Sequence, residues 1–262
     1  MVNQVSIGPM VNYLAAEVPP PRGGLYTAAN VVERPAPARL AGGMNLIATN
    51  CGEHGVNAID CGPTNDAPDG VLYVGDGPGL GEGFPAVEVW AADDCDFTRT
   101  GEEAAARANH LLALSERTDV ERHVATVLAS RAGELTSTTG GTMEERIIDA
   151  ISLAEGLLGG LSLPGVLHIP ARLAIYVKKA GGATWQANQA YSPLGHRIAF
   201  GGGYDEMGDA MYVTGPVTVL RSPVSTLAGD DRPHNERLTV ASREVAVGWE
   251  CLTTGYDLGG LE

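Results

Sequence analysis

The chain has 262 residues, which is long enough for one large domain or two small ones with a buried core. It has 35 glycines and 16 prolines but only 19% charged and 5% aromatic residues, a composition typical of turns and extended segments. The formal charge of −15 excludes direct coating of nucleic acid, because phosphate binding needs a cationic surface. No apolar run approaches the ~20 residues that span a bilayer, and no secretory signal opens the chain.

Residues 1–43 are expected to form an extended N-terminal arm, because prolines at 19–21, 35 and 37 disfavour long helices and central strands. From residue 44 to residue 97 the apolar runs are short and β-like, at 44–49, 71–74 and 86–90, with turn sequences between them. The sequence therefore predicts a long excursion resembling a β-hairpin, whose glycine-rich tip is residues 75–83.

Two helices follow, each opened by a capping box. Thr100 with Glu103 begins an apolar pattern of about 3.6-residue period that continues to Gly133, which predicts one helix of about 30 residues. Thr142 with Glu145 begins a second helix, of about four turns, which ends near residues 159–160.

The remainder of the chain alternates strands with one more helix. Residues 165–169 are predicted to be a buried strand, Pro170 to start a helix, and residues 181–182 to end it after Lys178 and Lys179. Extended runs follow at 197–200, 210–213, 217–220 and 238–252. The sequence thus predicts an α+β protein built around one long helix, without internal repeats.

The candidate chemical motifs mostly favour structural roles. Residues 75–83 lack the G-x-G-x-x-G spacing of a dinucleotide site and precede a strand, which favours a hairpin tip. The four cysteines, Cys51, Cys61, Cys95 and Cys251, are interpreted as reduced, packed thiols. A zinc site of Cys51, His54, Cys61 and Cys95, or a disulfide between Cys51 and Cys61, are the alternatives.

No catalytic constellation emerges, so we expect neither an enzyme nor a bound cofactor or metal. There is no nucleophile elbow, and His110 and His123 lie too far apart on the long helix for a zinc-peptidase pair. His168 is expected to be a hydrogen-bonded structural histidine within its strand. Glu144 and Glu145 are assigned to a helix N-terminal turn, and Asp93 with Asp94 to a solvated loop.

The segment from residue 143 to residue 222 carries a resemblance. A capped helix leads through a strand and proline into a second helix, and further strands follow, in the runs Gly165-Val-Leu-His-Ile-Pro-Ala-Arg172, Tyr191-Ser-Pro-Leu-Gly-His-Arg-Ile-Ala-Phe-Gly-Gly-Gly-Tyr204, Met211-Tyr-Val-Thr-Gly215 and Val217-Thr-Val-Leu-Arg221. This order resembles the C-terminal half of tailed-bacteriophage major capsid proteins of the Hong Kong 97 fold.

The resemblance implies the family's domain layout. Residues 1–43 would be the N-terminal arm, 44–97 the extended β loop called the E-loop, 98–139 with 230–262 the peripheral domain and its spine helix, and 140–229 a mixed helix and sheet axial domain. The implied function is a structural subunit that self-assembles in the host cytoplasm into the icosahedral capsid shell of the virion, around phage DNA, alone or with a paralogous chain.

The implied partners are copies of the chain in hexamers and pentamers, a portal, and optionally a decoration protein. A separate scaffold protein is also implied, because no long charged coiled segment precedes the arm. Neither specific nucleic-acid binding nor a membrane partner is expected. Another virion part (a tail tube or connector), a cellular encapsulating shell, and a soluble metal-dependent or thiol enzyme are the alternatives.

Some capsids of this fold join a lysine amine in the E-loop to an asparagine of a neighbour. Residues 44–97 contain no lysine, and the only two lysines, Lys178 and Lys179, end a helix. The sequence therefore predicts a shell without such isopeptide cross-links.

Overall fold

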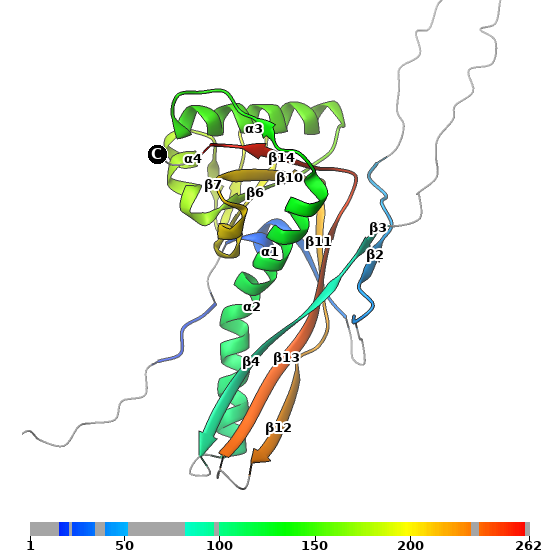
Figure 1. The fold of residues 1–262 in the computed structure, drawn as a ribbon, viewed down its shortest axis with the longest axis vertical. Coiled ribbons are helices and arrows are strands. Elements are labelled where there is room, and N and C mark those ends of the chain that lie inside the picture. The colour runs from blue at the N-terminus through cyan, green and yellow to red at the C-terminus, as the bar shows by residue number, and fades with distance from the viewer. Residues whose placement is uncertain are drawn as a thin grey trace, which may run out of the picture.

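The computed structural model describes residues 16–20, 23–34, 40–51, 82–96, 100–231 and 236–259. The predicted strand at 71–74, most of the predicted tip at 75–83, His54, Cys61 and the side chain of Cys95 lie outside this part of the chain. Within it, two sheets are joined by one long helix (Figure 1).

The first sheet, which we name the peripheral sheet, has five strands in the order β1-β11-β13-β12, with β4 on the other edge of β13. The names peripheral and axial refer here to the two sheets and not to the expected domain bounds, since β11 and most of β12 fall within 140–229 and β14 falls within 230–262. Its strands are β1 (Asn30–Glu33), β4 (Ala86–Asp96), β11 (Val217–Arg221), β12 (Ser225–Asp231) and β13 (Glu236–Trp249). Every pairing is antiparallel except that of β1 with β11. A separate two-stranded sheet, β2 (Met44–Leu46) with β3 (Glu82–Phe84), forms the root of the excursion.

The axial sheet has seven strands in the order β5-β14-β10-β6-β9-β8-β7. They are β5 (Thr136–Ser137), β6 (Val166–Pro170), β7 (Thr184–Gln186), β8 (Gln189–Tyr191), β9 (Arg197–Gly201), β10 (Ala210–Thr214) and β14 (Thr253–Asp257). Its helical elements are α3 (Met143–Gly160), α4 (Ala174–Lys179) and the 3₁₀ turns η1 (Ala171–Leu173) and η2 (Gly202–Met207). The buried stripe of α3, including Ile147, Ile151 and Leu158, forms a core with the apolar strands β6 and β10.

The helix α2 (Gly101–Ala132) runs along the long axis of the molecule and links the two sheets (Figure 1). Its capping box of Thr100 and Glu103 is present, as is that of Thr142 and Glu145 at α3, so both predicted helix starts are confirmed. The stripe Ala108, Leu112, Val124 and Leu128 is buried in one core with the inner faces of β4 and β13. None of the described helices combines the length and the apolar character needed to cross a membrane.

Two expectations differ from the structure. The segment expected to be an extended arm folds locally into α1 (Leu25–Ala28) and then into β1. The expected solvated loop at Asp93 and Asp94 is wrong, because both residues lie in β4, which pairs with β13 along its whole length. The Asp93 side chain is buried and is held by Arg107 at 3.2 Å, and this neighbouring charge compensates for its burial.

Candidate assembly surfaces

Glu121 fastens the start of the folded arm segment to the long helix. Its Oε1 accepts a hydrogen bond from the amide of Leu25 at 2.8 Å, and its Oε2 accepts one from Gly203 at 3.1 Å. Burial raises the pKa of the Glu121 carboxyl, while these amides oppose the shift. A side chain at Gly24, where φ is 71°, would collide with this carboxylate, so the approach requires glycine.

A second buried carboxylate, Glu116, holds the next part of the same segment. It accepts hydrogen bonds from the Tyr26 hydroxyl at 2.9 Å, Arg221 at 3.0 Å and Arg243 at 3.3 Å. Glu33 on β1 also binds Arg243, at 2.8 Å. Burial and the adjacent carboxylate raise the pKa of Tyr26, which therefore remains a donor at neutral pH. The segment of α1 and β1 is therefore held against α2, β11 and β13.

The root of the excursion is held by aromatic packing. Phe84 of β3 lies edge-on to Trp249 of β13 with ring centroids 4.9 Å apart, and the Arg131 guanidinium lies 4.0 Å from the Phe84 centroid. The Arg131 guanidinium also donates to the carbonyl of Gly83 at 2.6 Å. β2 and β3 are therefore fixed against the end of β13 and the end of α2.

The chain just beyond β2 is bound by Glu250 and by a disulfide. The Glu250 carboxylate accepts hydrogen bonds from the amides of Thr49 and Asn50 at 2.7 and 2.9 Å, and from the Asn50 side chain at 2.9 Å. Cys51 is bonded to Cys251, with Cα atoms 5.7 Å apart. The interpretation of these two residues as reduced thiols is therefore wrong, as is the alternative pairing of Cys51 with Cys61. Two hundred residues separate the partners, so no local spacing indicates the pair.

The outer face of the peripheral sheet, turned away from α2, carries an apolar patch. Register places Leu227, Val240 and Ala92 directly opposite one another on β12, β13 and β4. Trp90 and Leu238 lie on the same face, and Trp90, Leu227 and Leu238 are 62%, 68% and 48% exposed. Because alternation along a half-buried strand normally places polar residues outward, this outer patch is a candidate contact surface.

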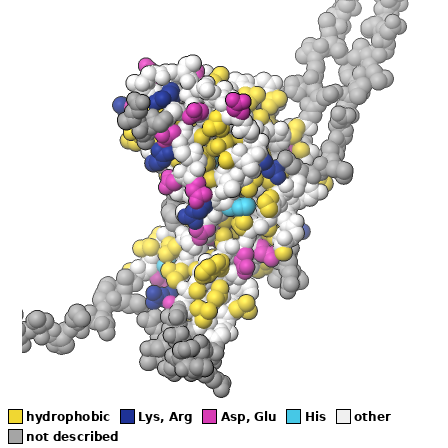
Figure 2. Space-filling model, viewed as in Figure 1, with side chains coloured by type: hydrophobic (Ala, Val, Ile, Leu, Met, Phe, Trp, Pro, Cys, Tyr) yellow, Lys and Arg dark blue, Asp and Glu magenta, His cyan; other side chains and the backbone are white. Residues whose placement is uncertain are grey.

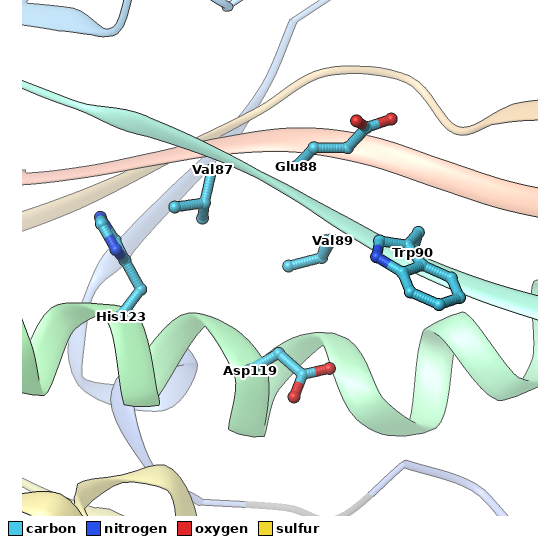
Figure 3. Close-up of a pocket in the computed structure, with 6 residues that line it drawn as sticks. All are labelled: Val87, Glu88, Val89, Trp90, Asp119 and His123. Carbon is cyan, nitrogen blue, oxygen red and sulfur yellow. The ribbon is translucent and has the colours of Figure 1, made fainter.

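A groove separates the free edge of β4 from α2 (Figure 3). It has a volume of about 340 Å³ and is lined by Val87, Val89 and Trp90 from β4 and by Asp119 and His123 from α2. Figure 2 shows hydrophobic side chains gathered among acidic ones on this side of the molecule. Burial lowers the pKa of His123, and the acidic side chains of the lining are Glu88 and Asp119, the latter paired with Arg122 at 2.8 Å.

A third exposed apolar set lies in the axial domain. Leu194 is 71% exposed and Ile175 is 64% exposed. Trp185 of the edge strand β7 is half exposed and stacks on Phe200 with centroids 5.5 Å apart. These side chains extend the candidate contact area to the other end of the subunit.

The residues singled out in the sequence mostly occupy structural positions. His168 is fully buried in β6, between the hydroxyls of Tyr204 at 2.9 Å and Thr214 at 3.0 Å, as expected. Burial lowers its pKa to about 3. Glu144 and Glu145 lie in the first turn of α3, and Lys179 at the end of α4 pairs with Glu144 at 2.5 Å. His110 approaches Glu17 at 3.9 Å and does not lie near His123 in the groove.

Comparison with known proteins gives no matching family model and no matching curated protein. Solved structures do match. One described as Mycobacterium phage Che8 superposes with a TM-score of 0.56 at 14% identity and covers 100% of both chains. Mycobacterium phage Adephagia gives 0.56 at 13% identity, covering 96% of this chain and 94% of the other, and the capsid of a native GTA particle gives 0.54 at 12%, covering 96% of each.

The chain has the Hong Kong 97-like fold. The match extends over both sheets and the long helix, because almost the full length of each chain is aligned. The names spine helix, E-loop root and arm root are used from here on for α2, for β2 with β3, and for the segment formed by α1 and β1. The predicted α+β class is therefore confirmed.

Proposed function

We propose that the chain is the structural subunit of an icosahedral capsid shell that encloses phage DNA. The observation that carries this proposal is the whole-chain agreement in fold with a structure described as a capsid. A subunit of this kind acts by binding copies of itself, so its functional residues are contact residues and the protein is not an enzyme. Hexamers and pentamers in a virion, built in the host cytoplasm with a separate scaffold protein, a portal and optionally a decoration protein, follow from the same proposal.

The surfaces support this proposal in two ways. The outer patch of the peripheral sheet and the exposed side chains of the axial domain lie at opposite ends of the subunit, so each subunit can contact neighbours on several sides. The arm and the E-loop both start from anchored roots, at Glu121 and Glu116 and at Phe84 and Glu250, which fixes the direction in which each leaves the body. The charge of −15 keeps a shell wall from adhering to packaged DNA.

The experiment is expression and purification of the chain, followed by gradient sedimentation and negative-stain microscopy of two preparations, one at low and one at high protein concentration. Closed shells or hexamer sheets support the proposal. Tubes or isolated rings would instead indicate a tail or connector protein, and a folded monomer in both preparations would refute assembly.

Two substitutions connect the result to the named surfaces. Leu227→Asp in the outer patch and Leu194→Asp in the axial domain should each give folded subunits that assemble at least ten times less, since a charge placed in an apolar contact is costly. Thr226→Asp, on the neighbouring exposed position of β12, is the matched control and should assemble more than Leu227→Asp.

A further inference from the structure

The disulfide lies where three parts of the subunit meet. Residues 250–252 carry the chain from β13 of the peripheral sheet to β14 of the axial sheet, and Gly215 with Pro216 make the return crossing from β10 to β11. The two crossings are hydrogen-bonded, from the Glu250 amide to the Pro216 carbonyl at 3.2 Å and from the Gly215 amide to the Leu252 carbonyl at 3.4 Å. Cys51 brings the E-loop to this joint.

The two cysteines are held at bonding separation by contacts that do not involve sulfur. Glu250 accepts three hydrogen bonds from Thr49 and Asn50, the residues just before Cys51, and is itself the residue just before Cys251. Cys251 has φ of 71° and lies at the centre of a tight turn, in which the Leu252 amide donates a hydrogen bond to the Glu250 carbonyl at 2.8 Å. The reduced chain therefore keeps both thiols close together, so closing the bond needs little backbone movement.

Both cysteines are exposed, which leaves the pair open to small redox reagents in the folded subunit. We propose that Cys51 and Cys251 are a redox-controlled clasp between the E-loop root and the crossing of the two sheets. The clasp is two thiols in reducing surroundings and a disulfide in oxidising ones.

The closing step is thiol–disulfide exchange with a small disulfide of the glutathione class. One thiol, as its thiolate, attacks the reagent and displaces one reduced thiol, and a mixed disulfide forms. The second protein thiol then displaces the other reduced thiol, so the two protein sulfurs lose two electrons and two protons, and the reagent gains them as two thiols.

The clasp has two mechanical effects. It closes a loop of 200 residues in the unfolded chain, which favours the folded state. In the folded state it adds a covalent bond to the hydrogen bonds from Thr49 and Asn50 that already hold the start of the E-loop against the inter-sheet joint. Only the next consequence rests on the proposed function. In the proposed shell, residues 49–51 would be held by hydrogen bonds alone during assembly in a reducing cytosol, and the covalent bond would form after the particle leaves it.

The test uses wild type and four serine variants of the full chain, each incubated with reduced or oxidised glutathione. Alkylation and peptide mapping report the bond, and scanning calorimetry reports the midpoint of unfolding. Wild type should yield a linked peptide pair containing Cys51 and Cys251 after oxidation, and reduction should lower its midpoint by about 10 °C. Cys51→Ser and Cys251→Ser should show the lower midpoint in both buffers, while Cys61→Ser and Cys95→Ser should respond as wild type does.

Three results would overturn the clasp. The first is free thiols at both Cys51 and Cys251 after oxidation. The second is an unfolding midpoint of Cys51→Ser that still differs between reduced and oxidised glutathione. The third, from a zinc assay of the purified proteins, is one equivalent of zinc bound to wild type and absent from Cys251→Ser. The last would indicate a metal site, since Glu250 also lies within 4.8 Å of both sulfurs. The mapping and calorimetry apply equally to dispersed subunits, so a chain that fails to form shells refutes the proposed function while leaving the clasp measurable.

Discussion

Removing the Glu116 carboxylate should destabilise the subunit far more than removing an exposed one. The side chains of Glu116 and Arg243 are each 7% exposed, so Glu116→Ala leaves a buried guanidinium whose remaining partner, Glu33, is 54% exposed and partly screened by water. Breaking a buried ion pair typically costs 3–5 kcal/mol, and with Glu33 still in place we expect about 3 kcal/mol. For a chain of this size that corresponds to a fall in unfolding midpoint of roughly 6–12 °C.

The assay is urea unfolding of dispersed subunits, followed by tryptophan fluorescence, for Glu116→Ala, Arg243→Ala and the double variant. This double-mutant cycle should give a coupling free energy of about 1.5–3 kcal/mol, because each substitution costs less when the other has already removed the opposite charge. Glu134→Ala, at an exposed position after the spine helix, is the control and should stay within about 0.5 kcal/mol of wild type. A cost below about 1 kcal/mol for Glu116→Ala, or two effects that simply add, would refute the argument.

Four further outcomes are expected. Leu112→Asp places an unpaired charge at a position 1% exposed and should abolish soluble subunits, whereas soluble, assembling protein would contradict the assigned core face. Deletion of residues 76–82 should spare the circular dichroism spectrum and block assembly, and normal shells would argue against a contact made by the E-loop tip. Boiled in detergent with reductant, shells should give a single band near 27.2 kDa, and a ladder resistant to reductant would reveal isopeptide bonds. Because the pKa of His168 falls to about 3 on folding, the unfolded chain binds more protons below pH 6.5, so the free energy of unfolding measured in urea should decrease as the pH falls from 6.5 toward 3, by up to about 1.4 kcal/mol per pH unit. His168→Gln should reduce this slope.

The parts of the fold that the sequence predicts are those specified by neighbouring residues. The spine helix and α3 begin at capping boxes, a signal contained in four residues, and their apolar period is recognised within a window of about 11–18 residues. The alternation at 238–252 likewise predicts β13, and the apolar run at 165–169 predicts β6. Each of these signals is local, so it is present in the sequence regardless of what packs against the element.

The parts that sequence reasoning misses depend on distant partners. The arm root folds because Glu121 and Glu116 accept hydrogen bonds from residues 96 and 90 positions away, and nothing near Leu25 or Tyr26 indicates this. The sequence around Asp93 favours a loop, because the Arg107 side chain that compensates for its burial comes from the spine helix. A disulfide between cysteines 200 residues apart follows only from the crossing of the two sheets, which no spacing rule contains.

Under the proposed function, the positions of the strong and weak contacts suit accurate assembly of a shell. The arm and the E-loop are held at their roots by buried or multiply bonded carboxylates, Glu121, Glu116 and Glu250, within one chain. These contacts form during folding and are not exchanged between subunits. The exposed patches around Leu227 and Leu194, by contrast, are apolar. Covering them stabilises a contact only in proportion to the apolar area that is buried. In the proposed shell, contacts of this kind would break readily while few neighbours are present and become collectively strong once the shell is closed, so misplaced subunits would leave before the particle is complete.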